Sequence, residues 1–225
     1  MDNPTGSPVE INLAHVVRRS SASGEPDNRA PGLLLLHGRG ADEYDLMGLE
    51  EGLDQRLTII SARAPFRLGG GFAWYDMMRV GEPHGETMQT SLQALREFIG
   101  GCVDAYTIDP ARLYLMGFSQ GAVMASAAAL IAPEKIQGVI MHSGYIPQGL
   151  GAEAKPEALA GKPFFVAHGK YDDVIPVTFG RDASEYLTEH NARLTYQEYP
   201  IGHTISEESF YDLSEWLTGE LDADH

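Results

Sequence analysis

One short segment of the sequence, Gly117-Phe118-Ser119-Gln120-Gly121, has the residue types and spacing of a nucleophile elbow. In an elbow the chain turns so tightly that the positions two before and two after the serine need small side chains, and glycine occupies both. An apolar run at 113–116 precedes the segment and small residues at 122–132 follow it, as a strand and a helix would. The alternative is an ordinary strand-to-helix turn without chemistry, because glycine and serine are common in turns.

A histidine downstream of the serine is a candidate base. A serine hydroxyl becomes a useful nucleophile only with a base within hydrogen-bond reach, and that base needs a carboxylate to hold its tautomer. His203 stands in a short loop between an alternating run at 194–199 and a helical pattern at about 206–218. His190 falls at the end of a predicted helix and His225 is the last residue, so neither is as well placed.

Two adjacent carboxylates are candidates for the acid. Asp172 and Asp173 follow an apolar run at 163–167, which predicts a strand. The order serine, acid, histidine along the chain is that of the hydrolase fold. Position in the chain does not separate the two residues, and each could instead be a turn carboxylate that caps the next helix.

An oxyanion that develops during acyl transfer needs backbone N–H donors aimed at it. The amide of Gln120, directly after the serine, is one candidate, and the loop at 37–40 is the expected source of the other. Because these donors are backbone groups, we expect the side chains of Gln120 and Arg39 to matter less than the loop shape. Gly38-Arg39-Gly40 could also open a dinucleotide-binding loop, but Glu43 stands where the third glycine belongs.

The elements that must position these residues alternate along the chain. Apolar or alternating runs predict strands at 32–36, 57–60, 112–117, 136–142, 163–167 and 194–199, with an edge strand or hairpin arm within 9–19. Helical spacing appears at about 42–55, 88–103, 121–132, 178–190 and 206–218. This alternation predicts an α/β fold with a mostly parallel sheet and helices on both faces. Ligands of such sheets bind beyond the carboxyl ends of the strands, where the candidate residues fall.

Length and composition limit the number of domains and exclude some classes of partner. We expect the 225 residues to form one domain, 1–225, with 1–7 and 220–225 flexible. The single cysteine, Cys102, excludes an internal disulfide, and no metal-ligand spacing is present. A net charge of −16 argues against nucleic acid and anionic membranes as partners. No secretory signal or membrane-spanning run is visible, so a cytoplasmic location without stable membrane insertion is expected.

With these residues together, the chain resembles the phospholipase/carboxylesterase family of α/β-hydrolases, which includes acyl-protein thioesterases and lysophospholipases. The matching residues run in family order over about 33–217 and form the following segments: Leu36-His37-Gly38-Arg39-Gly40-Ala41-Asp42, Ala64-Pro65, Trp74-Tyr75-Asp76, the elbow, Ser143-Gly144-Tyr145, His168-Gly169 with Asp172-Asp173-Val174-Ile175-Pro176, and Gly202-His203. The elbow and the segment at 168–176 are specific in combination.

The resemblance implies an α/β-hydrolase fold with a minimal cap domain or none, and neither metal nor cofactor. It implies that Asp172, rather than Asp173, is the acid, and that the amides of Arg39 and Gln120 are the oxyanion donors. The chain departs from the family, which often has leucine in place of Arg39 and an aliphatic residue in place of His142. Arg39 would put a cation beside the acyl or leaving-group path, unless it points to solvent or pairs with Asp42.

The aromatic and methionine-rich segment at 66–78 is a candidate wall of an acyl pocket, with Phe66 and Trp74 as lining residues together with Val174. The alternative is a satellite of the core under a loop. We therefore predict a serine esterase that acts on a small-molecule acyl ester or thioester as a monomer or homodimer. A dienelactone-hydrolase-like enzyme is an alternative, although those usually have cysteine as the nucleophile; a catalytically silent binding protein is another.

Overall fold

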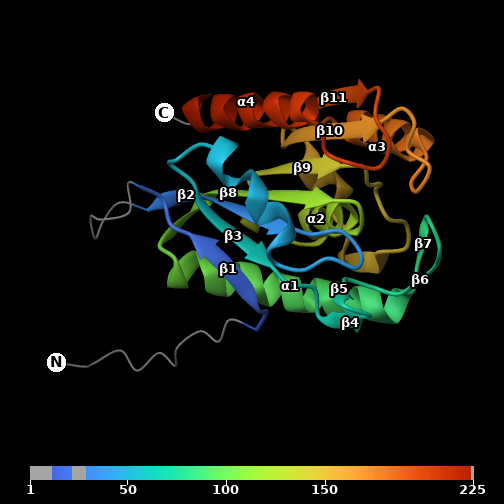
Figure 1. Ribbon diagram of the computed structural model, residues 1–225, viewed down its shortest axis with the longest axis horizontal. Coiled ribbons are helices and arrows are strands. Elements are labelled where there is room, and N and C mark those ends of the chain that lie inside the picture. The colour runs from blue at the N-terminus through green and yellow to red at the C-terminus, as the bar shows by residue number, and fades with distance from the viewer. Residues whose placement is uncertain (1–11, 22–28, 224–225) are drawn as a thin grey trace.

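The computed structural model describes residues 12–21 and 29–223, and a seven-stranded sheet forms its centre (Figure 1). The strand order is β1-β3-β2-β8-β9-β10-β11. The strands are β1 (His15–Arg18), β2 (Ala30–Leu36), β3 (Thr58–Ala62), β8 (Ile108–Phe118), β9 (Gly138–His142), β10 (Pro163–Gly169) and β11 (Arg193–Tyr199). Only the edge strand β1 is antiparallel to its neighbour among these pairs, which confirms the predicted mostly parallel sheet.

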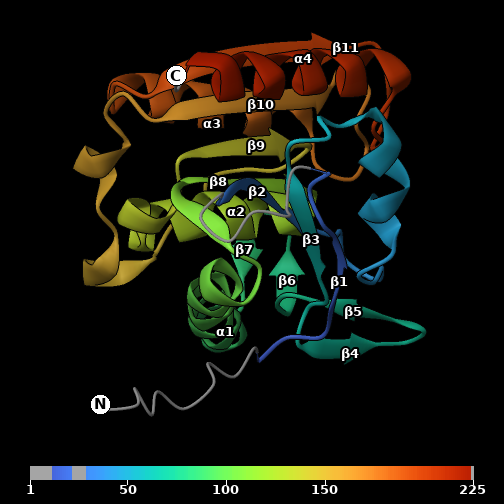
Figure 2. The ribbon, with the colours of Figure 1, turned by 90° about the vertical axis from the view of Figure 1, so that its left-hand side faces the viewer.

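Helices cover both faces of the sheet (Figure 2). The α-helices are α1 (Gly85–Ala105), α2 (Gln120–Ile131), α3 (Val177–Glu189) and α4 (Glu207–Ala223). Leu34 and Leu36 of β2 pack in one cluster with α1, α2 and α3. Leu33 and Leu35 pack in the other cluster with α4 and the 3₁₀ helix η1 (Asp45–Gly52). Because successive side chains on a strand point to opposite faces, the continuous leucine run fits a strand buried on both sides.

Helix α2, which begins directly after the candidate nucleophile, is buried along its whole length. Its small side chains let the helix lie close to the sheet, and the fit is tight at the first turn. A Cβ built at Gly144, in the loop after β9, would come within 2.5 Å of the Cβ of Ala122. The first turn of α2, which directly follows Ser119, is therefore packed tightly in the core.

Some of the segments that connect the strands differ from the sequence prediction. The helix predicted at 42–55 is wrong in type and length, because η1 is a 3₁₀ helix that contains the weak helix formers Gly48 and Gly52. The segment at 66–83 forms two small hairpins, from β4 (Phe66–Leu68), β5 (Gly71–Ala73), β6 (Met77–Arg79) and β7 (Glu82–Pro83). Three further 3₁₀ helices, η2 (Pro133–Lys135), η3 (Gly151–Glu153) and η4 (Pro156–Leu159), lie in the loops flanking β9.

The C-terminal segment is ordered further than predicted. Residues 220–223, expected to be flexible, form the last turn of α4. Leu221 is buried in the core, and Glu220 pairs with Arg193 of β11. These contacts hold the turn against the sheet, whereas the segment 1–7 and residues 224–225 lie outside the described residues.

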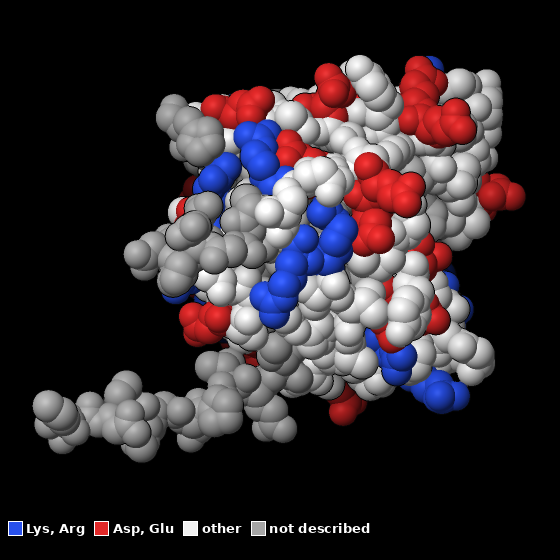
Figure 3. Space-filling model, turned by 60° about the vertical axis from the view of Figure 1, so that its left-hand side comes forward, with Lys and Arg blue, Asp and Glu red and all other residues white. Residues whose placement is uncertain are grey.

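Acidic side chains are spread over much of the face in Figure 3, whereas basic ones lie in a few smaller groups, consistent with the net charge of −16. In the part of the chain that the structure describes, no helix combines the length and the apolar character needed to cross a bilayer. Across residues 12–21 and 29–223, no group of three or more histidine, cysteine or carboxylate side chains is arranged to hold a metal ion.

Candidate active site

Ser119 lies at the junction of β8 and α2 in a conformation that few non-glycine residues adopt. Its φ is 54° and its ψ is −118°, a backbone strain worth about 1–3 kcal/mol. A Cβ built at Gly117 would lie 2.3 Å from the carbonyl carbon of Gly121, and one at Gly121 would lie 2.0 Å from the carbonyl oxygen of Leu36. Both glycines are therefore required by close backbone approach, and the segment has the geometry of an elbow rather than of an ordinary turn.

The three residues singled out by their order in the chain meet in space. His203, in the loop between β11 and α4, places its Nε2 atom 2.9 Å from the Oγ atom of Ser119. Its Nδ1 atom lies 2.7 Å from Oδ2 of Asp172, whose side chain is fully buried. Because an ionised carboxylate only accepts hydrogen bonds, Nδ1 carries the proton and Nε2 is left to accept from the serine hydroxyl.

The environment of Asp172 keeps its carboxylate ionised. Its Oδ1 atom accepts hydrogen bonds from the amides of Val174, at 3.0 Å, and Ile175, at 2.8 Å. Burial alone would raise the pKa of Asp172, but the hydrogen bonds from His203 and these amides outweigh it and lower that pKa. Asp173 is exposed beside it, and of these two adjacent carboxylates it is Asp172 that contacts His203.

A second histidine packs behind Asp172. The Nε2 atom of His168, at the end of β10, donates to the carbonyl oxygen of Ile175 at 2.8 Å and lies 3.5 Å from Oδ2 of Asp172. The Nδ1 atom has no hydrogen-bond partner among the described residues, and a Cβ built at Gly180 would lie 2.6 Å from it. Burial lowers the pKa of His168, so the ring is neutral and steadies the turn that carries Asp172.

A third buried histidine holds the loop after β2 beside the nucleophile. The Nδ1 atom of His37 donates to the carbonyl oxygen of Gly38 at 2.7 Å, and Nε2 accepts from the amide of Ala64 at 3.0 Å. The indole N–H of Trp74 donates to the carbonyl oxygen of His37 at 3.0 Å. Burial lowers the pKa of His37, which keeps the ring neutral in this arrangement. The loop passes close to the nucleophile, since a Cβ at Gly38 would lie 3.5 Å from that of Ser119.

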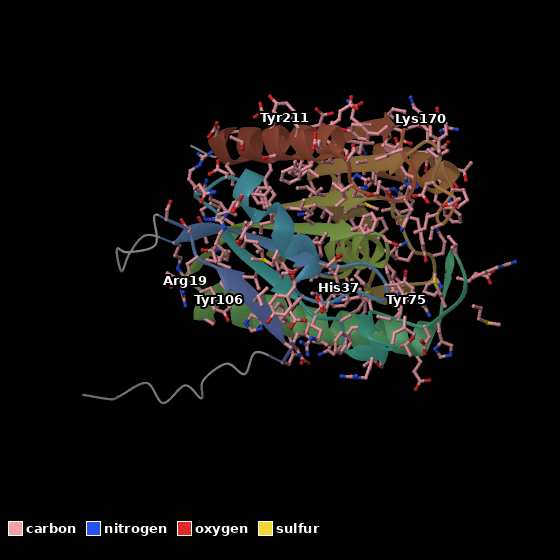
Figure 4. All side chains as sticks on the ribbon, viewed as in Figure 1. Arg19, His37, Tyr75, Tyr106, Lys170 and Tyr211 are labelled. Carbon is pink, nitrogen blue, oxygen red and sulfur yellow. The ribbon has the colours of Figure 1, made fainter. Side chains whose placement is uncertain are left out.

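The side chain of Gln120 has a role that the sequence did not reveal. It is buried, its Oε1 atom accepts from the amide of Trp74 at 2.8 Å, and its Nε2 atom donates to the carbonyl oxygen of Tyr75 at 2.7 Å. Gln120 is thus bonded to the loop that carries Tyr75, and the indole of Trp74 in that loop is bonded in turn to His37; His37 and Tyr75 are labelled in Figure 4. The side chain of Gln120 therefore helps to hold the neighbouring loop in shape, because its amide both donates and accepts.

A cleft of about 370 Å³ opens beside Ser119. Its lining includes Ser119, His203, Phe118, Val174, Arg39 and Asp45. A second cavity of about 400 Å³, between α3 and the loop after β9, is lined by none of the three residues Ser119, Asp172 and His203. The hydrogen-bonded serine identifies the first cleft as the candidate site, although it is slightly smaller.

Of the three residues predicted to line an acyl pocket, only Val174 lines this cleft. The prediction for Trp74 is wrong: its side chain is fully buried in the core and its indole N–H is bonded to the loop after β2. Phe66 is on β4, paired with Ala73, and it is absent from the cleft lining. Aromatic content alone could not distinguish a pocket wall from a core cluster, and the structure places Trp74 in the core.

His142, at the end of β9, is buried near the same residues. Its Nδ1 atom lies 3.2 Å from Oγ of Ser143 and its Nε2 atom 3.0 Å from Oγ of Ser209 in α4. Burial, followed by the nearby His168 and His203, lowers the pKa of His142 to about 3. The ring is therefore neutral and joins β9 to α4 through two serine hydroxyls.

This buried histidine makes folding stability depend on pH. Between about pH 6.5 and pH 3 the unfolded state binds a proton at His142 that the folded state does not, so the free energy of unfolding falls as the pH drops. The contribution of this residue is up to about 1.4 kcal/mol per pH unit. When the free energy of unfolding is measured with urea at several pH values, it is expected to change less with pH for His142→Gln than for the wild type. The exposed His84→Gln is the matched control, and equal slopes for wild type and His142→Gln would contradict the prediction.

Comparisons with known proteins agree with this geometry. A sequence model of the family described as phospholipase/carboxylesterase matches residues 22–220. The acyl-protein thioesterase 1 of Kluyveromyces lactis is 28% identical over 210 residues, which cover 84% of this chain and 91% of the thioesterase. That of Emericella nidulans is 26% identical over 220 residues, covering 86% and 91%. The crystal structure of the Bacillus cereus carboxylesterase is similar with a TM-score of 0.81 and 25% identity, covering 92% of this chain and 94% of that one.

These matches confirm the resemblance and the fold class expected from the sequence. The family model spans most of the chain, and it includes the elbow and the loops that carry Asp172 and His203. This chain belongs to the phospholipase/carboxylesterase family and is a hydrolase with the α/β-hydrolase fold.

Proposed function

We propose that this hydrolase cleaves carboxylic esters or thioesters of small molecules through an acyl-enzyme intermediate, with Ser119, His203 and Asp172 as its catalytic triad. The observation that carries the proposal is the continuous hydrogen-bonded chain from the Oγ atom of Ser119 through His203 to Asp172. The strained backbone of Ser119 at the mouth of a cleft adds to it, because it presents the hydroxyl to a substrate.

In the first half of the reaction, the Oγ atom of Ser119 attacks the acyl carbon while Nε2 of His203 takes the hydroxyl proton. Asp172 stabilises the imidazolium that forms and holds it in orientation. His203 then gives the proton to the leaving oxygen or sulfur as the bond to the acyl carbon breaks. In the second half, His203 takes a proton from water, the resulting hydroxide attacks the acyl-enzyme, and Ser119 is released with its proton restored.

The negative charge on the tetrahedral intermediates rests on the backbone amides of Gln120 and Arg39. Gln120 is the first residue of α2, where free N–H groups and the helix dipole favour an anion. The loop that carries Arg39 is held by His37 and by the hydrogen bond from the amide of Gly40 to Phe72 at 2.7 Å. Each donor of this kind is worth about 3–4 kcal/mol of the barrier.

Covalent labelling tests the proposal against a silent binding protein. A fluorophosphonate is expected to phosphonylate Ser119 with loss of fluoride, giving one adduct per chain by intact mass and an adduct on the peptide that contains Ser119. Ser119→Ala is the control and is expected to remain unlabelled. An unlabelled wild type would favour the binding protein instead. Turnover of a lactone in preference to linear esters would favour the dienelactone-hydrolase-like alternative.

A further inference from the structure

We propose that Arg39 selects substrates that carry an anionic group close to the reacting ester or thioester. This inference rests on the proposed function, because it assigns the substrate class of the same site. It concerns the side chain of Arg39, whereas the oxyanion is assigned to that residue's backbone amide.

The first observation is where Arg39 lies. Its side chain is exposed and lines the cleft that Ser119 and His203 open into. It follows Gly38 directly in the loop that passes beside the nucleophile. A guanidinium at this place faces whatever extends from the acyl carbon, and its planar fork binds carboxylate and phosphate groups with two parallel hydrogen bonds.

The second observation is that no carboxylate is paired with Arg39 among the described residues. Glu43 is held by both the Nε and the Nη2 atoms of Arg63. Asp42, considered from the sequence as a partner for Arg39, instead accepts a hydrogen bond from the amide of Tyr44 at 2.9 Å. Among the described residues, the guanidinium of Arg39 makes no ion pair or hydrogen bond.

The third observation is an opposite charge in the same cleft. Asp45, in the first turn of η1, also lines the cleft. In residues 12–21 and 29–223 its carboxylate has no ion-pair partner within 4.0 Å. Arg39 attracts an anionic substrate and Asp45 repels it. Removal of Arg39 should therefore weaken the preference for anionic substrates, and removal of Asp45 should strengthen it. The net charge of −16 does not cancel a local cation, because at physiological ionic strength charges beyond about 8 Å are largely screened.

Substrate pairs of equal shape separate this selection from general reactivity. On the acyl side, 4-nitrophenyl 5-carboxypentanoate is compared with the matching carboxamide, 4-nitrophenyl 5-carbamoylpentanoate. On the leaving-group side, 4-carboxyphenyl butyrate is compared with 4-carbamoylphenyl butyrate. Carboxylate and carboxamide have nearly the same shape, and the intrinsic reactivity of each ester is the same for every variant. The change in the ratio of kcat/KM within a pair, from wild type to variant, therefore reports the interaction of the protein with the charge. Changes in the oxyanion donor affect both members and cancel in the ratio.

The expected result is a wild-type preference of about two- to fivefold for the anionic member of at least one pair, which an exposed charge pair can supply. Arg39→Gln is expected to abolish this preference, and Asp45→Asn to increase it by about two- to fivefold. Arg96→Gln on α1 removes the same charge away from the cleft and is the matched control for net charge. The preference is also expected to weaken as salt is added.

The outcomes distinguish this inference from the proposed function. Equal turnover within both pairs, or a preference that Arg39→Gln leaves intact, would overturn the role of Arg39 while the esterase remained. Turnover of no member of either pair, together with absent fluorophosphonate labelling, would overturn the proposed function and this inference with it. The pair that shows the preference identifies whether the anion lies on the acyl or the leaving-group side.

Discussion

Ser119→Ala is expected to lower kcat for a simple 4-nitrophenyl ester by about 10⁵-fold or more, because loss of the nucleophile disables the triad as a unit. The protein should stay folded, since alanine has the same Cβ atom as serine and adds no backbone strain, and the hydroxyl contributes one hydrogen bond, to His203. Steady-state turnover and the thermal midpoint of both proteins measure the two effects. The variant is expected to keep a residual rate above that of the uncatalysed reaction, because substrate binding and the oxyanion donors remain.

A second serine of the same chain is the control. Ser143, in the loop after β9, is also buried and has the same φ of 54° as Ser119. Its Oγ atom contacts His142, whereas the hydrogen bonds of the His203 ring go to Ser119 and Asp172. Ser143→Ala is therefore expected to cost about 1 kcal/mol of stability and to change kcat by less than about tenfold. Similar activity losses in the two variants would show that loop integrity, rather than the Ser119 nucleophile, was lost.

Asp172→Asn is expected to lower kcat by about 10⁴-fold. Asparagine can still accept the hydrogen bonds from the amides of Val174 and Ile175, so the turn is expected to remain. It carries no charge to stabilise the imidazolium, and its NH₂ group favours the tautomer in which Nδ1 of His203 is unprotonated. In that tautomer Nε2 bears the proton and cannot accept the one on Ser119.

The neighbouring carboxylate supplies the matched comparison. Asp173→Asn makes the same chemical change one residue away, on an exposed side chain, and is expected to alter kcat by no more than about twofold. Ester turnover of the two variants, with their circular dichroism spectra to verify folding, measures the difference. Equal losses, or a larger loss in Asp173→Asn, would mean that the acid has been assigned to the wrong residue.

Much of the architecture was predictable because local patterns carry it. The leucine run that forms β2 is apolar at every position, as a strand buried on both faces requires. Short connections between alternating strands and helices restrict the topology to a parallel sheet with covered faces. The prediction failed at η1, where two glycines interrupt a leucine pattern that resembles an α-helix. The hairpins of 66–83 were not predicted, and their short strands form two-stranded sheets apart from the central one.

The candidate triad could be proposed from residue type and order because the hydrolase fold places strand ends on one edge. The sequence alone determined that a serine between glycines, an acid and a histidine would follow three strands. From the sequence, only the resemblance to a family favoured Asp172 over Asp173 as the acid. The structure adds that Asp172 is buried against His203, whereas Asp173 is exposed.

The tertiary structure alone decided the contacts between segments distant in the chain. Gln120 meets Trp74 and Tyr75 across more than 40 residues, and His37 bonds to the amide of Ala64. Trp74 packs in the core instead of lining the cleft, whereas Arg39 faces the cleft without an ion-pair partner among the described residues. Local sequence sets the backbone of each turn through glycine placement and hydrophobic periodicity. Which buried amide, imidazole or guanidinium finds a partner depends on how the loops pack against one another, and that packing appears only in the folded chain.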